Sequence, residues 1–281
     1  MLQISDITAL ILTYNEAPNL RRCLERLRWA ELVIVLDSGS TDETPAICAD
    51  FPNVRFVCRA FDTFAGQCNF GLSLVRTSWT LSLDADYVLP KDFASRIPDL
   101  KPNAAGYFFQ FDYCLAGKRL RCCLYPPRTV LYQTAAAVYQ DLGHGHRVLI
   151  RGNVQAANMT IAHDDRKPLS RWLDSQRRYA AQEAEHLSKP TTDTGLADRV
   201  RRKIWLSLPA VIFYVLIVQR GILDGWPGLY YAFQRGYAEL LLSLELLDRK
   251  LRLQNDLTTG NIRKNFVPND RNTGSDAGSA T

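Results

Sequence analysis

Two carboxylates stand one residue apart at the end of an apolar run, where residues 81–90 read LSLDADYVLP and contain Asp84 and Asp86. Side chains at positions i and i+2 of a strand point the same way, so the two carboxylates can converge. Such a pair repels itself, and a divalent cation removes that cost. Mg²⁺ and Mn²⁺ prefer carboxylate oxygens and usually keep positions for water and substrate phosphates. The stretch therefore suggests a metal site for a nucleoside diphosphate, although a D-x-D triplet also arises by chance.

The elements before this stretch give it a structural context, because apolar β-branched runs alternate with segments of helical spacing. The expected elements are strands at 7–13, 32–36, 54–58 and 79–83 and helices at 20–29, 40–51 and 64–75. This alternation predicts a parallel sheet, and ligands bind such sheets at the carboxyl ends of the strands. Polar residues follow three of these ends, in TYNE, in VLDSGSTDET and in DADY. In the second stretch, Ser40, Asp42 and Glu43 could instead only cap the next helix.

Three ordered stretches resemble the family 2 glycosyltransferases of the GT-A fold: LILTYNEAPNLRRCL, VLDSGSTDET and GQCNFGLSLVRTSWTLSLDADYVLP. The resemblance covers most of residues 7–92, and three motifs in order are more specific than one. It implies an α/β fold with a mostly parallel nucleotide-binding sheet flanked by helices. It implies that the nucleotide pocket is lined by Thr13, Tyr14 and Glu16 and that Asp37 contacts the base. It also implies that Asn69 contacts the substrate and that Asp84 contacts the ribose and the sugar. Asp86 would be a metal ligand. Cys68 replaces the arginine that usually precedes the asparagine.

The same resemblance implies an acidic general base on an acceptor-side loop, and Asp141 in QDLGHGHRV is the best match. His144 is the alternative base, because histidine titrates near working pH. In an inverting transfer this group takes the proton of the acceptor hydroxyl while a metal, Mg²⁺ or Mn²⁺, neutralises the leaving nucleotide. His163 in TIAHDDRKPL matches a histidine metal ligand found late in such catalytic domains. Alternatively, His163 and Asp164 only cap a helix that starts near Pro168.

Two later stretches, IAHDDRKPLSRWLDSQRRYAAQEAEHL and GILDGWPGLYYAF, resemble the branch of bacterial lipopolysaccharide-core glucosyltransferases. That branch typically reads DADE, so Tyr87 stands here in place of a glutamate. The resemblance implies transfer of a hexose from a UDP-sugar to a lipid-linked or lipopolysaccharide-type glycan. One alternative is a sugar-phosphate nucleotidyltransferase, which usually has a glycine-rich basic loop where this chain reads TYNEAPNL. The other is a non-catalytic protein of the same fold, which loss of Asp86 or Asp141 would have favoured.

The composition is typical of a globular cytoplasmic protein. The chain has 281 residues, of which 47% are hydrophobic, enough for a sizeable core. The formal net charge of +5 is modest, so nucleic acid is not an expected partner. The seven cysteines include no CxxC pair, which argues against a zinc site. The N-terminal MLQISDITALIL reads as a first strand and not as a signal peptide, so we expect a cytoplasmic location.

The C-terminal part carries two apolar segments. Residues 204–218 form a run of 15 residues without a charge, with basic residues on both sides. A spanning helix needs about 20 apolar residues, so this run is too short. The second segment covers 229–247. Basic flanks and terminal aromatics predict helices that lie on the cytoplasmic face of the inner membrane, and the alternative is burial against the sheet. The expected organisation is a catalytic domain at 1–190, a helical membrane-interface extension at 196–254 and a disordered tail at 255–281.

Overall fold

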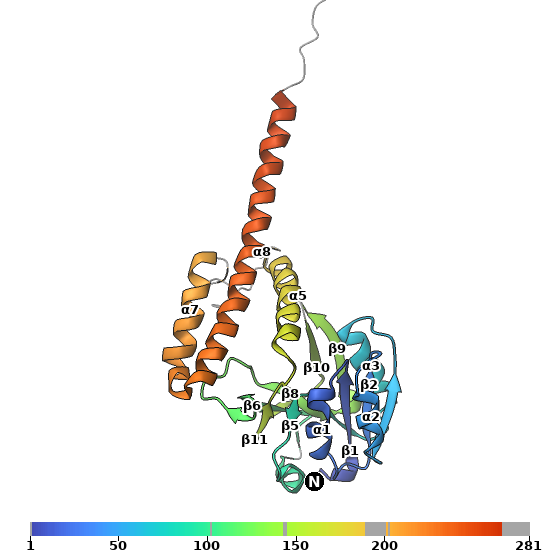
Figure 1. Cartoon of the computed structure of the whole chain (residues 1–281). Helices are drawn as coiled ribbons and strands as arrows, with labels where there is room; N and C mark the ends of the chain where they lie inside the picture. Colours follow the sequence, from blue (N-terminus) through green and yellow to red (C-terminus); the bar gives the residue numbers. More distant parts are fainter. Residues whose placement is uncertain (1, 102, 143–144, 189–200, 202, 266–281) are drawn as a thin grey trace, which may run out of the picture.

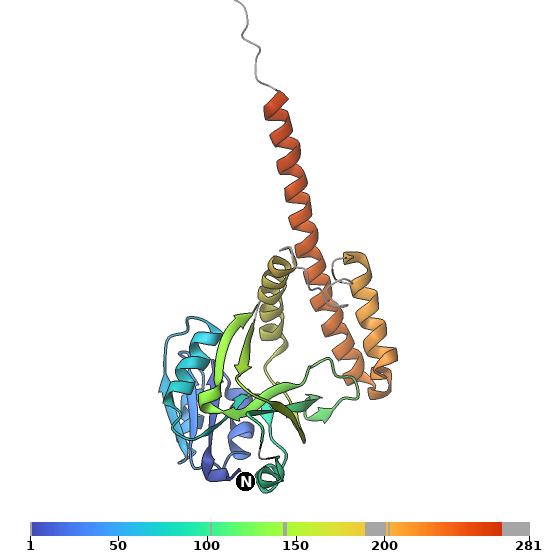
Figure 2. The ribbon, with the colours of Figure 1, turned by 180° about the vertical axis from the view of Figure 1, so that it is seen from behind.

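One large sheet forms the body of the protein, and helices extend from it. The computed structural model describes residues 2–101, 103–142, 145–188, 201 and 203–265. Helices cover the sheet, and the C-terminal helices lie to one side of this α/β body (Figure 1 and Figure 2). The α/β class and the helical C-terminal region expected from the sequence are both confirmed.

Four parallel strands form the first half of the sheet. They are β1 (Ile7–Thr13), β2 (Val33–Asp37), β3 (Val54–Cys58) and β4 (Trp79–Asp84), in the spatial order β3-β2-β1-β4. β1 and β2 are apolar and almost wholly buried, as expected of parallel strands that are covered on both faces. Thr13 lies opposite Asp37 in the pairing of β1 with β2, so these strands end at the same edge. The four strands predicted from the sequence are confirmed to within one residue.

Three helices connect these strands: α1 (Ala17–Glu25), α2 (Thr44–Ala49) and α3 (Phe64–Leu74). Pro18 in the first turn of α1 costs no hydrogen bond there, because the first amides of a helix have no partner within it. α3 begins after Thr63, whose hydroxyl accepts a hydrogen bond from the Gly66 amide at 3.0 Å. Gly71 lets α3 approach β1 closely, since a Cβ at this position would lie 2.8 Å from Cδ1 of Leu10.

The second half of the sheet is mixed. Beyond β4 it adds β8 (Arg128–Gln133), β6 (Gly106–Leu115), β11 (Val154–His163) and β5 (Tyr87–Val88), while β7 (Lys118–Arg119) pairs with β6. β8 runs antiparallel to both β4 and β6, whereas β11 runs parallel to β6. A separate hairpin of β9 (Ala137–Leu142) and β10 (Gly145–Ile150) packs on α3. The short helix α4 (Phe93–Arg96) adds Phe93 to the main apolar core.

A strand pairing brings the DADY stretch next to a distant part of the chain. β5 runs antiparallel to β11, and His163, the last residue of β11, lies opposite Tyr87, the first residue of β5. The Asp164 amide also donates a hydrogen bond to the carbonyl of Asp86 at 3.0 Å. The turn from β4 to β5 is therefore fixed against the end of β11.

After β11 the described chain is helical. It contains α5 (Leu169–Ser188), 3₁₀ turns at Ile204–Leu206 and Gly221–Asp224, α7 (Ser207–Phe213), which continues as a π-helical turn over Tyr214–Val218, and α8 (Trp226–Asn265). α8 packs against α5 and α7 and then projects beyond them (Figure 1). Its helical path includes residues 255–265, part of the range 255–281 for which the sequence predicted a disordered tail. Residues 266–281 and the linker expected at 190–195 lie outside the described residues.

The helical extension exposes many large apolar side chains. Trp226 is 83% exposed, and Phe213, Ile222 and Leu223 are each 60% exposed. Within the described residues, no helix combines the length and the apolar character that crossing a bilayer requires.

Candidate active site

Asp86 and His163, the two metal ligands expected from the sequence, lie together. Nε2 of His163 is 3.2 Å from Oδ2 of Asp86, and each side chain is only about one-seventh exposed, at 14% and 13%. Burial disfavours charge on both groups, but their mutual attraction outweighs it, so the pKa of His163 is raised and the pKa of Asp86 is lowered. Asp84 is exposed at the end of β4.

Two polar atoms of the Asp86–His163 pair are left without a partner in the described part of the chain. Oδ1 of Asp86 and Nδ1 of His163 are buried, and neither has a hydrogen-bond partner among the described residues. Buried polar atoms without partners are rare and call for an explanation such as an ion. Carboxylate oxygen and imidazole nitrogen are both donors to Mn²⁺, so these residues fit a divalent cation. Within the described residues no cluster of three or more such side chains is present, so water and substrate oxygens would complete the coordination.

Aromatic rings enclose His163. The ring centroid of His163 lies 4.4 Å from that of Tyr125, 5.1 Å from Tyr113 and 5.6 Å from Tyr87. Tyr87 is 2% exposed, and its hydroxyl shares a hydrogen bond with the hydroxyl of Tyr125. Tyr87, which stands where related sequences carry a glutamate, is thus part of the wall around His163. Desolvation in this wall raises the pKa of Tyr87 well above its usual value.

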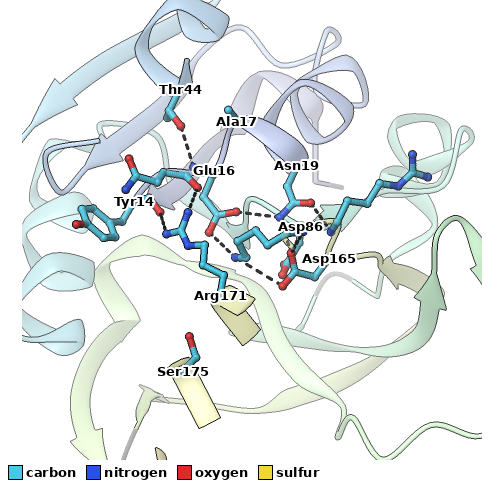
Figure 3. A network of polar contacts seen from close by, with 12 residues as sticks. Tyr14, Glu16, Ala17, Asn19, Thr44, Asp86, Asp165, Arg171 and Ser175 are labelled. Carbon is cyan, nitrogen blue, oxygen red and sulfur yellow. Dashed lines mark hydrogen bonds and ion pairs between the residues drawn. The ribbon is translucent and has the colours of Figure 1, made fainter. Parts of the chain in front are cut away.

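The loop after β1 is held by a network that the sequence did not reveal. Oε1 of Glu16 accepts a hydrogen bond from Nζ of Lys167 at 2.7 Å, and Oε2 accepts one from Asn19 at 2.9 Å. The Asn19 amide also donates to Oδ1 of Asp165 at 2.8 Å. Figure 3 shows Glu16, Asn19 and Asp165 gathered beside Asp86. Burial raises the pKa of Glu16 despite its cationic neighbour, whereas for Lys167 the attraction of Glu16 outweighs burial and the pKa is raised.

The first turn of α5 fixes the same loop from the other side. The guanidinium of Arg171 donates to the carbonyl of Tyr14 at 2.9 Å and to that of Asn15 at 2.6 Å (Figure 3). The Tyr14 side chain itself is 54% exposed, with the Arg171 guanidinium 5.8 Å from its ring centroid. Asn15 has a positive φ of 53°, and its side-chain oxygen accepts from the amide of Thr41 at 2.7 Å. The exposed Tyr14 ring is therefore presented on a rigid loop.

The carboxylate of Asp37 is buried and already bonded by the chain. It accepts from the Thr13 hydroxyl at 2.8 Å, the Gly39 amide at 2.9 Å and the Ser40 amide at 2.7 Å. Asp37 is 1% exposed. In this arrangement Thr13 and Asp37 together shape the turn after β2, which faces the loop after β1. Direct contact of Asp37 with a base stays a prediction.

Asn69 and Asp141 lie at the contact between α3 and the β9–β10 hairpin. Nδ2 of the Asn69 side chain donates a hydrogen bond to the backbone carbonyl of Tyr139 at 3.0 Å. Oδ1 of the same side chain accepts one from the backbone amide of Tyr139 at 2.9 Å. Oδ1 of Asp141 accepts from the amide of Ala65, in the first turn of α3, at 2.9 Å. Both residues thus attach β9 to α3. Cys68 is 1% exposed in the core on the same helix, and His144 lies outside the described residues.

The alternative role of Asp164 as a helix cap is not the one observed. Its carboxylate is buried and pairs with Arg22 at 2.6 Å and with Arg166 at 2.9 Å. In the sequence, the only feature that could predict these contacts is the charged stretch HDDRKP, between the end of β11 and α5. Such a run reads equally as a solvated loop, so the sequence named His163 but not the partners of Asp164, Asp165 and Lys167.

Comparison with known proteins gives a consistent picture. Residues 8–114 match the family model described as glycosyl transferase family 2. The lipopolysaccharide core biosynthesis glycosyltransferase LpsC of Rhizobium meliloti is 32% identical over 98 residues, which cover 34% of this chain and 36% of LpsC. An uncharacterized glycosyltransferase of Rickettsia bellii is 35% identical over 92 residues, which cover 32% of this chain and 31% of that protein. The matched part thus spans about a third of the length of these relatives.

Longer matches are more distant. An uncharacterized glycosyltransferase of Rickettsia prowazekii is 21% identical over 275 residues, 92% of each chain. The solved structure of S. aureus TarS with UDP-GlcNAc shares 14% identity at a TM-score of 0.46, covering 87% of this chain and 92% of the TarS chain. The motifs and the matched segment agree, and residues 8–114 are similar to glycosyl transferase family 2.

Proposed function

We propose that the chain transfers a hexose from a UDP-sugar, with inversion, to a lipid-linked or lipopolysaccharide-type glycan acceptor. The observation that carries this proposal is the buried Asp86–His163 pair, in which Nε2 of His163 lies 3.2 Å from Oδ2 of Asp86 while one further polar atom of each side chain has no partner among the described residues. Asp86 lies beside Glu16, on the loop that also presents Tyr14 (Figure 3). Sugar transfer from a nucleoside diphosphate needs both a cation at the diphosphate and a pocket for the nucleotide.

Asp86 and His163 would hold Mg²⁺ or Mn²⁺. When bound, the cation would neutralise charge on the departing diphosphate. Asp84 is exposed two residues from Asp86, in a position to accept hydrogen bonds from the ribose or the sugar. The aromatic wall around His163 excludes water from one side of the pair, which strengthens the electrostatic interactions within it.

The nucleotide would bind beside the loops after β1 and β2. The exposed Tyr14 ring offers a surface on which a base can stack. Thr13 and Asp37 support the floor of this pocket through their mutual hydrogen bond. Glu16 is paired with Lys167, so this carboxylate orients the loop next to the diphosphate position.

In the transfer step, the acceptor hydroxyl oxygen forms a bond to C1 of the sugar as the bond from C1 to the diphosphate breaks. The nucleoside diphosphate leaves with that electron pair, and the hydroxyl proton passes to a base. We assign this role to Asp141, with His144 as the alternative. The hydrogen bond from the Ala65 amide to Oδ1 of Asp141 orients this carboxylate at the start of α3. Asn69 would position this base by holding β9 through the backbone of Tyr139.

The acceptor class is supported by the helical extension. Its exposed apolar side chains, on α7 and at the start of α8, suit a membrane surface at the cytoplasmic side. LpsC is named for lipopolysaccharide core biosynthesis, which agrees with a lipid-borne glycan as acceptor.

A donor screen tests the proposal. UDP-glucose, UDP-galactose, UDP-GlcNAc and GDP-mannose would be incubated with the protein and either Mg²⁺ or Mn²⁺, and release of nucleoside diphosphate would be measured. We expect slow, metal-dependent hydrolysis of one UDP-sugar in the absence of acceptor. Metal-independent release, or none from any donor together with no donor binding, would refute the proposal.

A further inference from the structure

Arg128 stands beside the DADY turn but has no role in the site described so far. It is the first residue of β8, and β8 runs antiparallel to β4, so Arg128 lies next to the end of β4 where Asp84 stands. Both side chains are exposed. Two oppositely charged groups from neighbouring strands therefore border the same open side of the site.

The position of the Arg128 side chain is fixed by an aromatic contact. Its guanidinium carbon lies 5.0 Å from the ring centroid of Tyr125. Tyr125 in turn shares a hydrogen bond with Tyr87 and packs against His163 at 4.4 Å between ring centroids. Stacking covers one face of a guanidinium and leaves its N–H edge available for planar anions. Arg128 is thus held at a defined place relative to the Asp86–His163 pair.

Arg128 differs from the other cations near this site in its lack of a partner. Within the described residues, Arg128 makes neither an ion pair nor a hydrogen bond through its side chain. The other cations are occupied: Lys167 by Glu16, and Arg22 and Arg166 by Asp164. Partial desolvation by the neighbouring rings opposes the charge of Arg128, but the ionisable groups of Tyr125, Tyr87 and Asp84 outweigh it, so its pKa is raised.

Position 68, where related sequences carry an arginine, offers no cation in this chain. Position 68 on α3 is a cysteine that is 1% exposed in the apolar core. Burial there raises the pKa of the Cys68 thiol, so the side chain is neutral. A phosphate bound beside Asp84 would need a positive neighbour, and among the cations compared above Arg128 is the one without an ion-pair partner in the described part of the chain.

We propose that Arg128 binds a phosphate group of the substrate beside Asp84. The proposal rests on the proposed function, because it takes the substrate to carry phosphate. Two sources share this chemistry: the diphosphate of the donor and a phosphate on the acceptor. An arginine can offer two parallel N–H groups to such an anion, which a lysine cannot.

The first test compares UDP with uridine by calorimetry in the presence of Mn²⁺. If Arg128 binds the donor diphosphate, Arg128→Ala should weaken UDP binding about tenfold or more, with Arg128→Lys intermediate and uridine binding unchanged. The control is Arg55→Ala, an exposed arginine on β3, three strands away from β4 in the first half of the sheet, which should bind UDP like the wild type. Near-ultraviolet circular dichroism would verify that each variant is folded.

A second experiment tests whether Arg128 binds a phosphate group of the acceptor. Inorganic phosphate would be titrated into the protein saturated with UDP and the diamagnetic Mg²⁺ and followed by ³¹P NMR. If Arg128 binds an acceptor phosphate, Arg128→Ala should leave UDP binding intact and abolish the phosphate-induced shift. Unchanged binding of both UDP and phosphate in Arg128→Ala would overturn the inference. Failure of the wild type to bind UDP at all would instead refute the proposed function, and the inference with it.

Discussion

Nε2 of His163 lies 3.2 Å from Oδ2 of Asp86, although 77 residues separate them along the chain. The contact depends on the pairing of β5 with β11, which sets His163 opposite Tyr87. Tyr87, Tyr113 and Tyr125 then enclose the imidazole. The fold therefore fixes the position of the pair, as the proposed metal site requires.

The Glu16–Lys167 pair should stabilise the fold as well as the loop after β1. Lys167→Met removes the cation from Glu16, whose side chain is only 14% exposed, so we expect the free energy of unfolding to fall by about 1.5–3 kcal/mol. Urea unfolding of Lys167→Met, Glu16→Gln and the double variant would give the coupling free energy, which should exceed ~1 kcal/mol. The exposed Arg28–Glu25 pair is the control, for which we expect no measurable coupling. Similar coupling in the two pairs would refute the prediction.

Asp141→Asn should lower the rate of sugar transfer without lowering the stability of the fold. Asparagine keeps a side-chain oxygen for the Ala65 amide, so the free energy of unfolding should change little. Loss of the base should lower kcat by a factor of about 10²–10⁴. Steady-state kinetics with the donor identified in the screen would measure this, with the exposed Asp99→Asn as control. Near-normal kcat in Asp141→Asn, together with a large loss in His144→Ala, would transfer the role to His144.

Asp42 should make the fold sensitive to acid. Its carboxylate accepts from the amides of Ala17 and Thr44, and these hydrogen bonds outweigh desolvation, so the pKa of Asp42 lies below its ordinary value of 3.8. The ionised Asp42 carboxylate therefore stabilises the fold fully at pH values above its unfolded pKa of about 4. This stabilisation is lost as the pH falls through the lower pKa of the folded state. Asp42→Ala should lower the free energy of unfolding by about 1 kcal/mol at pH 7. Urea unfolding from pH 7 to pH 3 would measure the difference in free energy of unfolding between the wild type and Asp42→Ala, which should shrink only at the acid end. A difference that is constant over this pH range would contradict a contribution from the ionised Asp42 carboxylate.

The start of α8 should mediate association with membranes. Trp226 is 83% exposed and Leu223 is 60% exposed, so both can enter a bilayer interface without disturbing the fold. Burying one such side chain contributes about 1.5–3 kcal/mol, so Trp226→Ser should weaken vesicle binding by about tenfold or more. Co-sedimentation with phosphatidylglycerol vesicles would measure it. Phe61→Ser, at a 50% exposed position in the sheet-containing body, is the control; equal losses in Phe61→Ser and Trp226→Ser would exclude a local membrane site.

The sequence was most informative where periodicity and strand ends decide the structure. The alternation of apolar runs predicted β1 to β4, and the rule that ligands bind at carboxyl ends of strands directed attention to Glu16, Asp37 and Asp84. The resemblance supplied the roles of Asp86 and His163 as metal ligands; the structure brings their side chains to 3.2 Å, and the roles stay a prediction. These features depend on short segments of chain.

What the sequence did not reveal are contacts between side chains far apart in the chain. Nothing in HDDRKP shows that Lys167 meets Glu16, because that contact depends on how α5 leaves β11. Nor could spacing show that the Asn69 amide is bonded to the backbone of Tyr139 or that Asp37 is bonded by its own turn. The boundary of α8 was also missed, since a polar helix that continues from a packed one looks like a disordered tail.

The proposed function is tested most directly by UDP calorimetry with and without Mn²⁺, using the wild type, Asp86→Asn and His163→Gln. The wild type should bind UDP much more tightly with Mn²⁺ than without it, and both variants should lose that gain while remaining folded by circular dichroism. Asp99→Asn should behave like the wild type. Tight Mn²⁺-dependent UDP binding that persists in both Asp86→Asn and His163→Gln would contradict the assignment of this pair as the metal site.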